Sequence, residues 1–218
     1  MTRHEIVQYL LDNCIVAIVR ADKGGDALVK IVEAIAAGGV KCIEVTMTTP
    51  GALECIKTAT EKLKDVDVLI GVGSVLDAET ARLAILAGAE YVVCPITSEE
   101  VIRMAHRYGK PVMPGAFTPN EIFKAWELGG DIIKIFPATL GGLEYIKAVR
   151  APMPQIPVIP TGGVDLSNLA EFMKAGISGV GIGSALVRKD LVANEDYVGL
   201  TALAKQYADA FQAAKAAL

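Results

Sequence analysis

The sequence is poor in residues that bind metals or act as imidazole bases. Only two histidines occur among its 218 residues, His4 and His106, and neither has a second ligand at metal-binding spacing. Four cysteines lie in the first half of the chain: Cys14, Cys42, Cys55 and Cys94. Their spacing fits no metal site, and three stand in apolar strand-like runs, where free cysteine behaves as a small hydrophobe. We therefore expect buried structural thiols, no metal or other cofactor, and no Ser-His-Asp triad.

Basic excess and long apolar runs are also missing. The 21 Lys and Arg against 25 Asp and Glu give a net charge of -4. This balance argues against a nucleic acid or an anionic membrane as a general partner, although it leaves room for local positive charge in one cleft. No apolar run approaches the roughly 18 residues that span a bilayer. The N-terminus enters an amphipathic pattern directly, without a signal-peptide core, so a soluble, cytoplasmic protein is expected.

Short β-branched runs alternate with longer helical patterns along the whole chain. Strands are predicted at 15–19, 41–45, 68–71, 91–93, 111–113, 132–135, 158–159 and 179–181. About eight strands is the number that a closed parallel barrel requires. No Gly-x-Gly-x-x-Gly follows the first strand, which argues against a dinucleotide-binding open sheet. We expect an α/β protein, a single (β/α)8 TIM-barrel domain over residues 1–218 with a short N-terminal helix.

Glycines and capping residues predict the helix ends. Five glycines follow a helical stretch and precede a strand, as a C-terminal helix cap does: Gly38, Gly88, Gly109, Gly129 and Gly176. Thr49-Pro50 and Thr118-Pro119 each place a capping threonine before a proline of the first turn, and Ser98 precedes two glutamates. Apolar residues at helical spacing predict a core-facing closing helix: Leu200, Leu203, Ala204, Tyr207, Phe211 and Leu218.

Lys134 interrupts an apolar strand near its end. Side-chain alternation sends Ile133 and Ile135 toward the helices and Lys134 into the barrel. Burial disfavours the ammonium form, which would leave a neutral, nucleophilic amine. A structural pair between this lysine and a carboxylate is the alternative, and the strand alone does not choose between the two.

Two further polar residues belong to predicted strands. Glu44 lies between Ile43 and Val45 and therefore faces inward, where a carboxylate needs a cation or a raised pKa. Glu44 and Lys134 at one barrel mouth would form a base and nucleophile, or else an inert buried ion pair. Arg20 ends the first strand, and its planar fork suits a carboxylate or phosphate, although a surface arginine is common there.

Two glycine loops predict a phosphate cradle. Thr161-Gly162-Gly163 follows the seventh strand, and Gly181-Ile182-Gly183-Ser184 follows the eighth and is expected to open a short helix. Glycines let the backbone approach an anion, and the N–H groups of a helix start face it. Loops after strands seven and eight are the usual phosphate site of such barrels.

The chain resembles the class I aldolases that act on 2-keto-3-deoxy-6-phosphogluconate (KDPG) and 4-hydroxy-2-oxoglutarate (KHG). The resemblance extends from residue 15 to residue 187. It rests on ordered motifs: Ala17-Ile18-Val19-Arg20, Gly38-Gly39-Val40, Ile43-Glu44-Val45-Thr46, Gly71-Val72-Gly73-Ser74-Val75-Leu76, Met113-Pro114-Gly115, Lys134-Ile135-Phe136-Pro137-Ala138, Pro160-Thr161-Gly162-Gly163-Val164 and Gly183-Ser184-Ala185-Leu186-Val187.

The resemblance implies a lyase that cleaves KDPG to pyruvate and glyceraldehyde 3-phosphate in the Entner-Doudoroff pathway. Lys134 would form the Schiff base and Glu44 would be the acid–base residue. The substrate-binding residues would be Arg20, Ser74 and Thr161 at the keto-acid end, Pro95 and Phe136 as pocket wall, and Gly162, Gly163, Gly183 and Ser184 at the phosphate. A homotrimer is implied in the same way.

Two positions depart from the common family pattern. Thr48 stands where many members have an arginine that binds the pyruvate carboxylate, which moves that role to Arg20 and leaves substrate preference open. Ser74 replaces the usual threonine, and its hydroxyl can serve the same purpose. The galactonate epimer of KDPG or KHG could therefore be the substrate. A metal-dependent epimerase would need strand-end His and Asp ligands, and a non-catalytic phosphosugar-binding barrel would not need Glu44 and Lys134 together.

Overall fold

The computed structural model describes all 218 residues and contains only parallel strand pairs. The strands are β1 (Ile15–Val19), β2 (Cys42–Thr46), β3 (Leu69–Gly73), β4 (Val92–Val93), β5 (Val112–Met113), β6 (Gly115–Ala116), β7 (Ile133–Ile135), β8 (Val158–Pro160) and β9 (Val180–Ile182). They form a six-stranded sheet in the order β5-β4-β3-β2-β1-β9 and a three-stranded sheet in the order β6-β7-β8.

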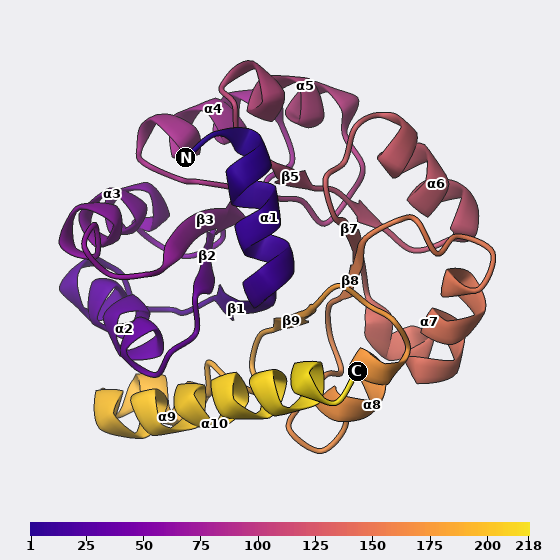
Figure 1. The fold of residues 1–218 in the computed structure, drawn as a ribbon. Helices are drawn as coiled ribbons and strands as arrows, with labels where there is room; N and C mark the ends of the chain where they lie inside the picture. The colour runs from indigo at the N-terminus through magenta and orange to yellow at the C-terminus, as the bar shows by residue number, and fades with distance from the viewer.

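Helices surround the strands and alternate with them along the chain (Figure 1). They are α1 (Arg3–Asn13), α2 (Gly25–Ala37), α3 (Ala52–Lys62), α4 (Ala78–Leu86), α5 (Glu99–Arg107), α6 (Pro119–Glu127), the 3-10 helix η1 (Ala138–Leu140), α7 (Gly142–Arg150), α8 (Leu169–Lys174), α9 (Lys189–Ala193) and α10 (Tyr197–Ala216). None of them is long and apolar enough to cross a membrane.

The predicted α/β class, the parallel strands and the N-terminal helix are confirmed, but the strands lie in two sheets rather than in one closed sheet. Pro114 separates β5 from the short strand β6, which was not predicted, because proline has no N–H to give to a ladder. On the other side, a single bridge between Thr161 and Gly181 is the ladder contact between the end of β8 and β9.

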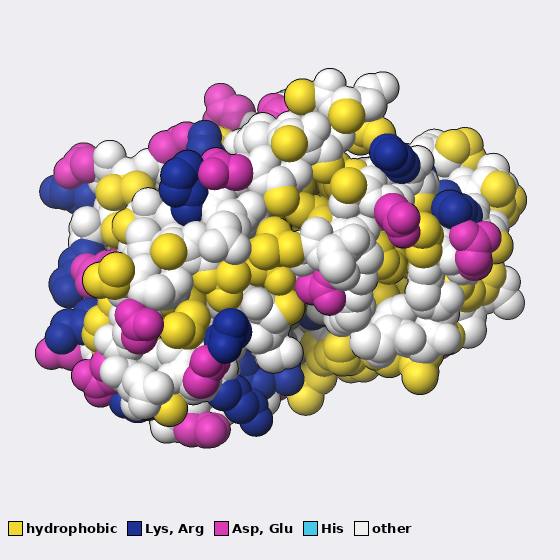
Figure 2. Space-filling model, turned by 90° about the horizontal axis from the view of Figure 1, so that it is seen from below, with side chains coloured by type: hydrophobic (Ala, Val, Ile, Leu, Met, Phe, Trp, Pro, Cys, Tyr) yellow, Lys and Arg dark blue, Asp and Glu magenta, His cyan; other side chains and the backbone are white.

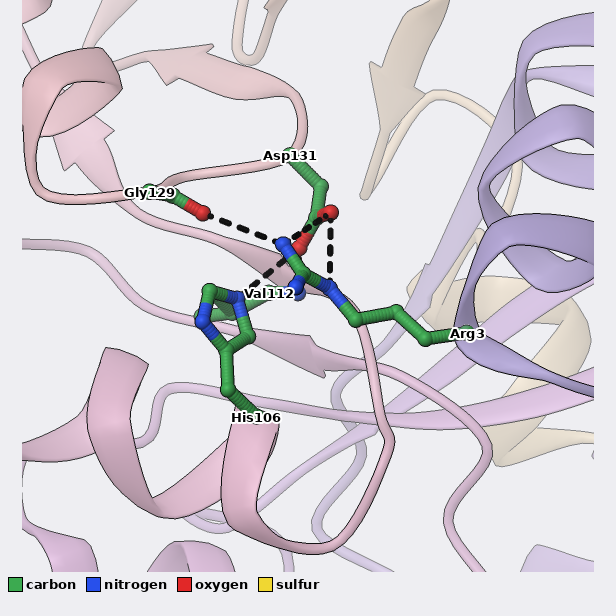
Figure 3. A network of polar contacts seen from close by, with 5 residues as sticks. All are labelled: Arg3, His106, Val112, Gly129 and Asp131. Atoms are coloured by element: carbon green, nitrogen blue, oxygen red, sulfur yellow. Dashed lines mark hydrogen bonds and ion pairs between the residues drawn. The ribbon is translucent and has the colours of Figure 1, made fainter.

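The amino-terminal helix α1 lies across the ring of strands (Figure 1) and packs against side chains of the strands. Its residues Ile6 and Leu10 are fully buried in a cluster with Tyr91 and other strand residues. A polar network holds it there: Arg3 donates two hydrogen bonds to Asp131, of 2.7 and 3.0 Å (Figure 3). Asp131 also accepts a 2.9 Å bond from the Val112 N–H and lies 3.4 Å from Nε2 of His106. These contacts fix α1 to α5 and to the start of β7.

The predicted helix ends are correct where the partners are local. Thr118 caps α6 in a capping box with Glu121, and Ser98 caps α5. Gly88, Gly109, Gly129 and Gly176 have the positive φ of a terminating glycine, whereas Gly38 stays in the right-handed region and Gly39, at φ 89°, makes the turn.

The prediction that Thr49 caps a helix is wrong. Helix α3 begins only at Ala52, and its N-cap is Gly51. The Thr49 hydroxyl is buried and lies 3.1 Å from the Thr46 hydroxyl, while it accepts a bond from the Ala21 N–H. Because the Thr46 hydroxyl and the distant Ala21 N–H occupy the Thr49 hydroxyl, it does not cap the helix.

The closing helix α10 packs against α2 and α8, as its periodicity predicts. Its buried side chains are Leu200, Ala204, Tyr207, Phe211 and Ala214. Leu203 is only half-buried, and Leu218 is exposed because the helix ends before it. All four cysteines are free and buried, as expected. On the face seen in Figure 2, acidic and basic side chains lie among one another rather than gathering by sign.

Candidate active site

A cavity of about 760 Å³ opens at the carboxyl ends of the strands. It is lined by residues of β1, β7 and β9 and by the loops that follow β1, β3, β4, β7, β8 and β9. Ten of the eleven predicted site residues are among them: Arg20, Ser74, Pro95, Lys134, Phe136, Thr161, Gly162, Gly163, Gly183 and Ser184. The eleventh, Glu44, lies beneath the cavity surface rather than on it. Concave sites with a few convergent polar groups are the usual ligand sites of proteins.

Lys134 stands on β7 with its side chain turned inward. Ile133 and Ile135 belong to the core between strands and helices, as alternation predicts, and Lys134 is 6% exposed. Its Nζ lies 5.3 Å from the centroid of the Phe136 ring, within the range of a cation–π contact. No carboxylate forms an ion pair or hydrogen bond with it, and both oxygens of the nearby Glu44 are without a hydrogen-bond partner. This arrangement disfavours a structural Lys–carboxylate pair.

Glu44 is the buried acid of the site. It stands on β2 and is 1% exposed. Burial raises the pKa of its carboxyl group, and the positive charges of Lys134 and Arg20 offset part of that rise. Gly73 on β3 makes room for it, since a Cβ there would overlap the Glu44 carboxylate. The site therefore holds an acid that can take up a proton at a higher pH than an exposed glutamate.

Arg20 and Ser74 lie together at one side of the cavity. The Arg20 Nη2 donates a 3.3 Å hydrogen bond to the Ser74 hydroxyl. Ser74 follows β3 with φ 58°, a left-handed conformation that a serine adopts at a cost. The strained turn and the guanidinium together present one cation and one hydroxyl to a ligand. Thr48 is not among the lining residues, and its hydroxyl lies 3.0 Å from that of Thr46.

The two glycine loops face the same cavity. Gly162 and Gly163 both have positive φ, of 96° and 77°, so other residues would be strained there. Thr161 is buried before them, and its hydroxyl has no hydrogen-bond partner. Together with Gly183 across the cavity, these loops bring backbone close to a common space.

The predicted helix directly after Ser184 is wrong. The Gly183 carbonyl accepts bonds from the N–H groups of Leu186 and Val187, which closes a tight turn. Helix α9 begins only at Lys189. The Gly183-Ser184 segment is therefore an anion-binding candidate through its backbone turn, not through a helix N-terminus.

Four charged lining residues were missed by sequence reasoning: Asp22, Lys23, Asp165 and Lys189. Asp22 and Lys23 come two and three residues after Arg20 in the loop that follows the first strand, so their place at a strand end is the signal that indicates them. Lys23 forms a 2.8 Å ion pair with Glu195 and donates to the Ala193 carbonyl, which ties the β1 loop to α9. Lys189 follows a turn whose length the sequence does not reveal.

The chemistry available at this site is specific. A buried amine without a bonded acid can add to a carbonyl group, and a buried carboxyl can move a proton beside it. Arg20 and the glycine loops can hold anionic groups at two sides of the same cavity.

A family model for KDPG and KHG aldolases matches residues 6–203. The chain is 35% identical to a 2-dehydro-3-deoxy-phosphogluconate aldolase of Treponema pallidum, over 88% of this chain and 90% of that one. It is also 35% identical to the 2-dehydro-3-deoxy-6-phosphogalactonate aldolase of Escherichia coli, over 91% and 96%.

A solved structure extends the likeness to three dimensions. The KDPG aldolase of Legionella pneumophila, with pyruvate captured as a covalent carbinolamine intermediate, is 27% identical and superposes with a TM-score of 0.82, covering 91% of this chain and 96% of that one. Sequence motifs, fold and site geometry agree with these matches. The chain belongs to the KDPG and KHG aldolase family.

Proposed function

We propose that this aldolase cleaves KDPG to pyruvate and glyceraldehyde 3-phosphate through a Schiff base on Lys134. The observation that carries the proposal is the Lys134 amine, buried in the floor of the cavity without a bonded carboxylate. In the Legionella relative, pyruvate forms a covalent carbinolamine, the adduct that an amine gives with a ketone.

The first stage joins enzyme and substrate. The Lys134 amine, once it has lost its proton, adds to the C2 ketone to give a carbinolamine, and loss of water leaves an iminium ion. The iminium withdraws electrons from the C3–C4 bond, so this route supplies its own electrophile.

The second stage breaks the carbon chain. Glu44, directly or through a water, removes the proton of the C4 hydroxyl. The C4 oxygen becomes the aldehyde of glyceraldehyde 3-phosphate while the C3–C4 electron pair forms an enamine on Lys134. The enamine then takes a proton at C3, and hydrolysis of the resulting iminium releases pyruvate and the free amine.

The remaining lining residues hold the two ends of the substrate. Arg20, with Ser74 and Thr161, binds the keto-acid carboxylate, since its guanidinium offers a planar pair of donors. The glycine loops at 162–163 and 183–184 bind the phosphate through backbone N–H groups. Pro95 and Phe136 form the apolar wall between them.

Two other substrates belong to the same proposal as alternatives. The Escherichia coli relative acts on the galactonate epimer, and the family model includes KHG. A comparison of kcat/KM for KDPG, its galactonate epimer and KHG decides among them, and we expect KDPG to give the highest value.

Borohydride trapping tests the proposal most directly. Incubation with pyruvate and sodium borohydride, followed by peptide mass spectrometry, should find a reduced pyruvyl adduct on the peptide that contains Lys134. Lys134→Arg keeps the positive charge but should give no adduct and no turnover. An adduct on another lysine, or robust cleavage by the variant, contradicts the assignment.

We further propose that the chain is one domain, that its two sheets form one closed (β/α)8 barrel, and that three copies assemble into a homotrimer. The bridge between Thr161 and Gly181 supports closure on one side, and the short gap at Pro114 supports it on the other. Exposed apolar side chains on α4 and α6, such as Leu86 and Trp126, support a surface that binds other copies of the chain. Light scattering, which measures the mass of the particle in solution, tests the trimer.

We also propose that the protein resides in a reducing compartment such as the cytoplasm. Its four free thiols support this assignment.

A further inference from the structure

Tyr91 carries a buried hydroxyl group that the fold does not use. The residue stands immediately before β4 and is 0% exposed, and its hydroxyl has no hydrogen-bond partner. A buried polar group without a partner destabilises a protein, while phenylalanine would fill the same space without it. The hydroxyl therefore indicates a function other than stabilising the fold.

Two glycines of β3 place the Tyr91 ring next to the catalytic carboxyl group. A Cβ at Gly71 would lie 2.5 Å from Cε2 and Cζ of Tyr91, so the ring lies against the Gly71 backbone. A Cβ at Gly73 would overlap the Glu44 carboxylate. The two glycines are two residues apart and face the same side of the strand, a spacing of about 7 Å. Gly71 is also the ladder partner of Glu44. The Tyr91 phenol and the Glu44 carboxyl group therefore lie in adjacent layers of inward-facing side chains.

We propose that Tyr91 is a positioning residue for the acid–base step, whose hydroxyl donates a hydrogen bond to the Glu44 carboxylate through one bridging water. This inference rests on the proposed role of Glu44. Donation to a carboxylate favours its charged form, which is the form that removes the C4 hydroxyl proton. Tyr91 thereby counteracts the effect of burial and keeps Glu44 available as a base.

The other groups around this pair do not replace Tyr91. Glu44 faces Lys134 from β7, Arg20 after β1 and Cys94 after β4. The Lys134 amine is consumed in the Schiff base, and Arg20 binds Ser74 and the substrate carboxylate. Tyr91 faces Glu44 and the thiols of Cys14 and Cys42, and Tyr9 lies beyond. Burial raises the pKa of all three thiols, so they remain neutral and are weak donors.

The experiment compares Tyr91→Phe with the wild type and with Tyr207→Phe, which removes the hydroxyl of another buried tyrosine, on α10, that is not a lining residue of the cavity. Two rates are followed across pH: cleavage of KDPG, and exchange of the pyruvate methyl hydrogens in D2O, which needs no phosphorylated substrate. In Tyr91→Phe we expect the acidic limb of both profiles to move up by about one pH unit. The melting temperature at pH 7 should stay equal or fall slightly, because the charged Glu44 carboxylate loses a hydrogen-bond donor. Tyr207→Phe should leave the limb in place.

The outcomes distinguish the proposed role of Tyr91 from the proposed role of Glu44. An acidic limb that is unchanged in Tyr91→Phe overturns the positioning role, even if the rate falls at every pH, because a packing defect lowers rates without moving the limb. Glu44→Gln is measured in parallel. If it keeps the wild-type rate and profile, the proposed function of Glu44 fails. If it loses activity while Tyr91→Phe keeps the wild-type limb, only the role of Tyr91 fails.

Discussion

Asp131→Asn should cost stability without costing chemistry. The Asp131 side chain is 7% exposed and joins Arg3 of α1, His106 of α5 and the Val112 N–H (Figure 3). An asparagine has one oxygen, so its amide group must turn toward either Arg3 or the Val112 N–H. One charge-assisted bond of about 1.5–3 kcal/mol is lost, and a donor is left facing a donor. We expect a loss of about 3 kcal/mol, or about 9 °C in Tm for a chain of this length.

The loss should depend on pH in a defined direction. Burial by itself would raise the pKa of Asp131, but the bonds from His106, Arg3 and Val112 outweigh it and the pKa is lowered. A carboxyl group whose pKa is lower in the folded state stabilises the fold above its unfolded value of about 3.9, and this contribution disappears as pH falls through the folded value. The gap between wild type and Asp131→Asn should be full at pH 7 and narrow below about pH 4.

Urea unfolding followed by circular dichroism measures both effects. Asp209→Asn is the matched control, because its ion pair with Lys205 is exposed, at 65% and 68% of the two side chains, and should contribute about 0.5 kcal/mol or less. Turnover of the folded Asp131→Asn protein should equal that of the wild type, since the network lies at the end of the strands opposite the cavity. A loss below 1 kcal/mol, or a gap that stays the same size down to pH 3, refutes the reasoning.

Three shorter predictions concern the site and the helix ends. Gly73→Ala should lower the kcat of cleavage at least about tenfold, because the alanine Cβ would displace the Glu44 carboxylate. An unchanged kcat in cleavage kinetics would show that the carboxylate can move freely. Arg20→Gln should raise the KM for the keto acid about tenfold or more, because the guanidinium binds the substrate carboxylate. Borohydride should still trap pyruvate at high pyruvate concentration. A KM equal to that of the wild type would show that other residues bind the carboxylate. Thr118→Ala should cost about 1 kcal/mol in urea unfolding and leave kinetics unchanged, because it removes only the cap of α6.

Local patterns in the sequence determined much of the fold. Alternation within β2 and β7 placed Glu44 and Lys134 inward, because successive side chains of a strand point to opposite faces whatever the strand packs against. The capping role of Thr118 was equally readable, since its partner Glu121 lies only three residues away. The strand-end residues that line the cavity follow from the same rule, because the carboxyl ends of parallel strands meet at one edge.

Contacts between distant parts of the chain were decided only by the tertiary structure. Thr49 looked like a cap, but its hydroxyl meets the Ala21 N–H 28 residues away. Arg3 and Asp131 are 128 residues apart, and neither alone indicates the other. Whether Lys134 had a carboxylate partner was likewise open until Glu44 was found buried and unbonded. Strand and helix periods are properties of the local backbone and can be read from a short segment. Which polar groups meet depends on strand order and on the space left between side chains, which only the folded chain defines.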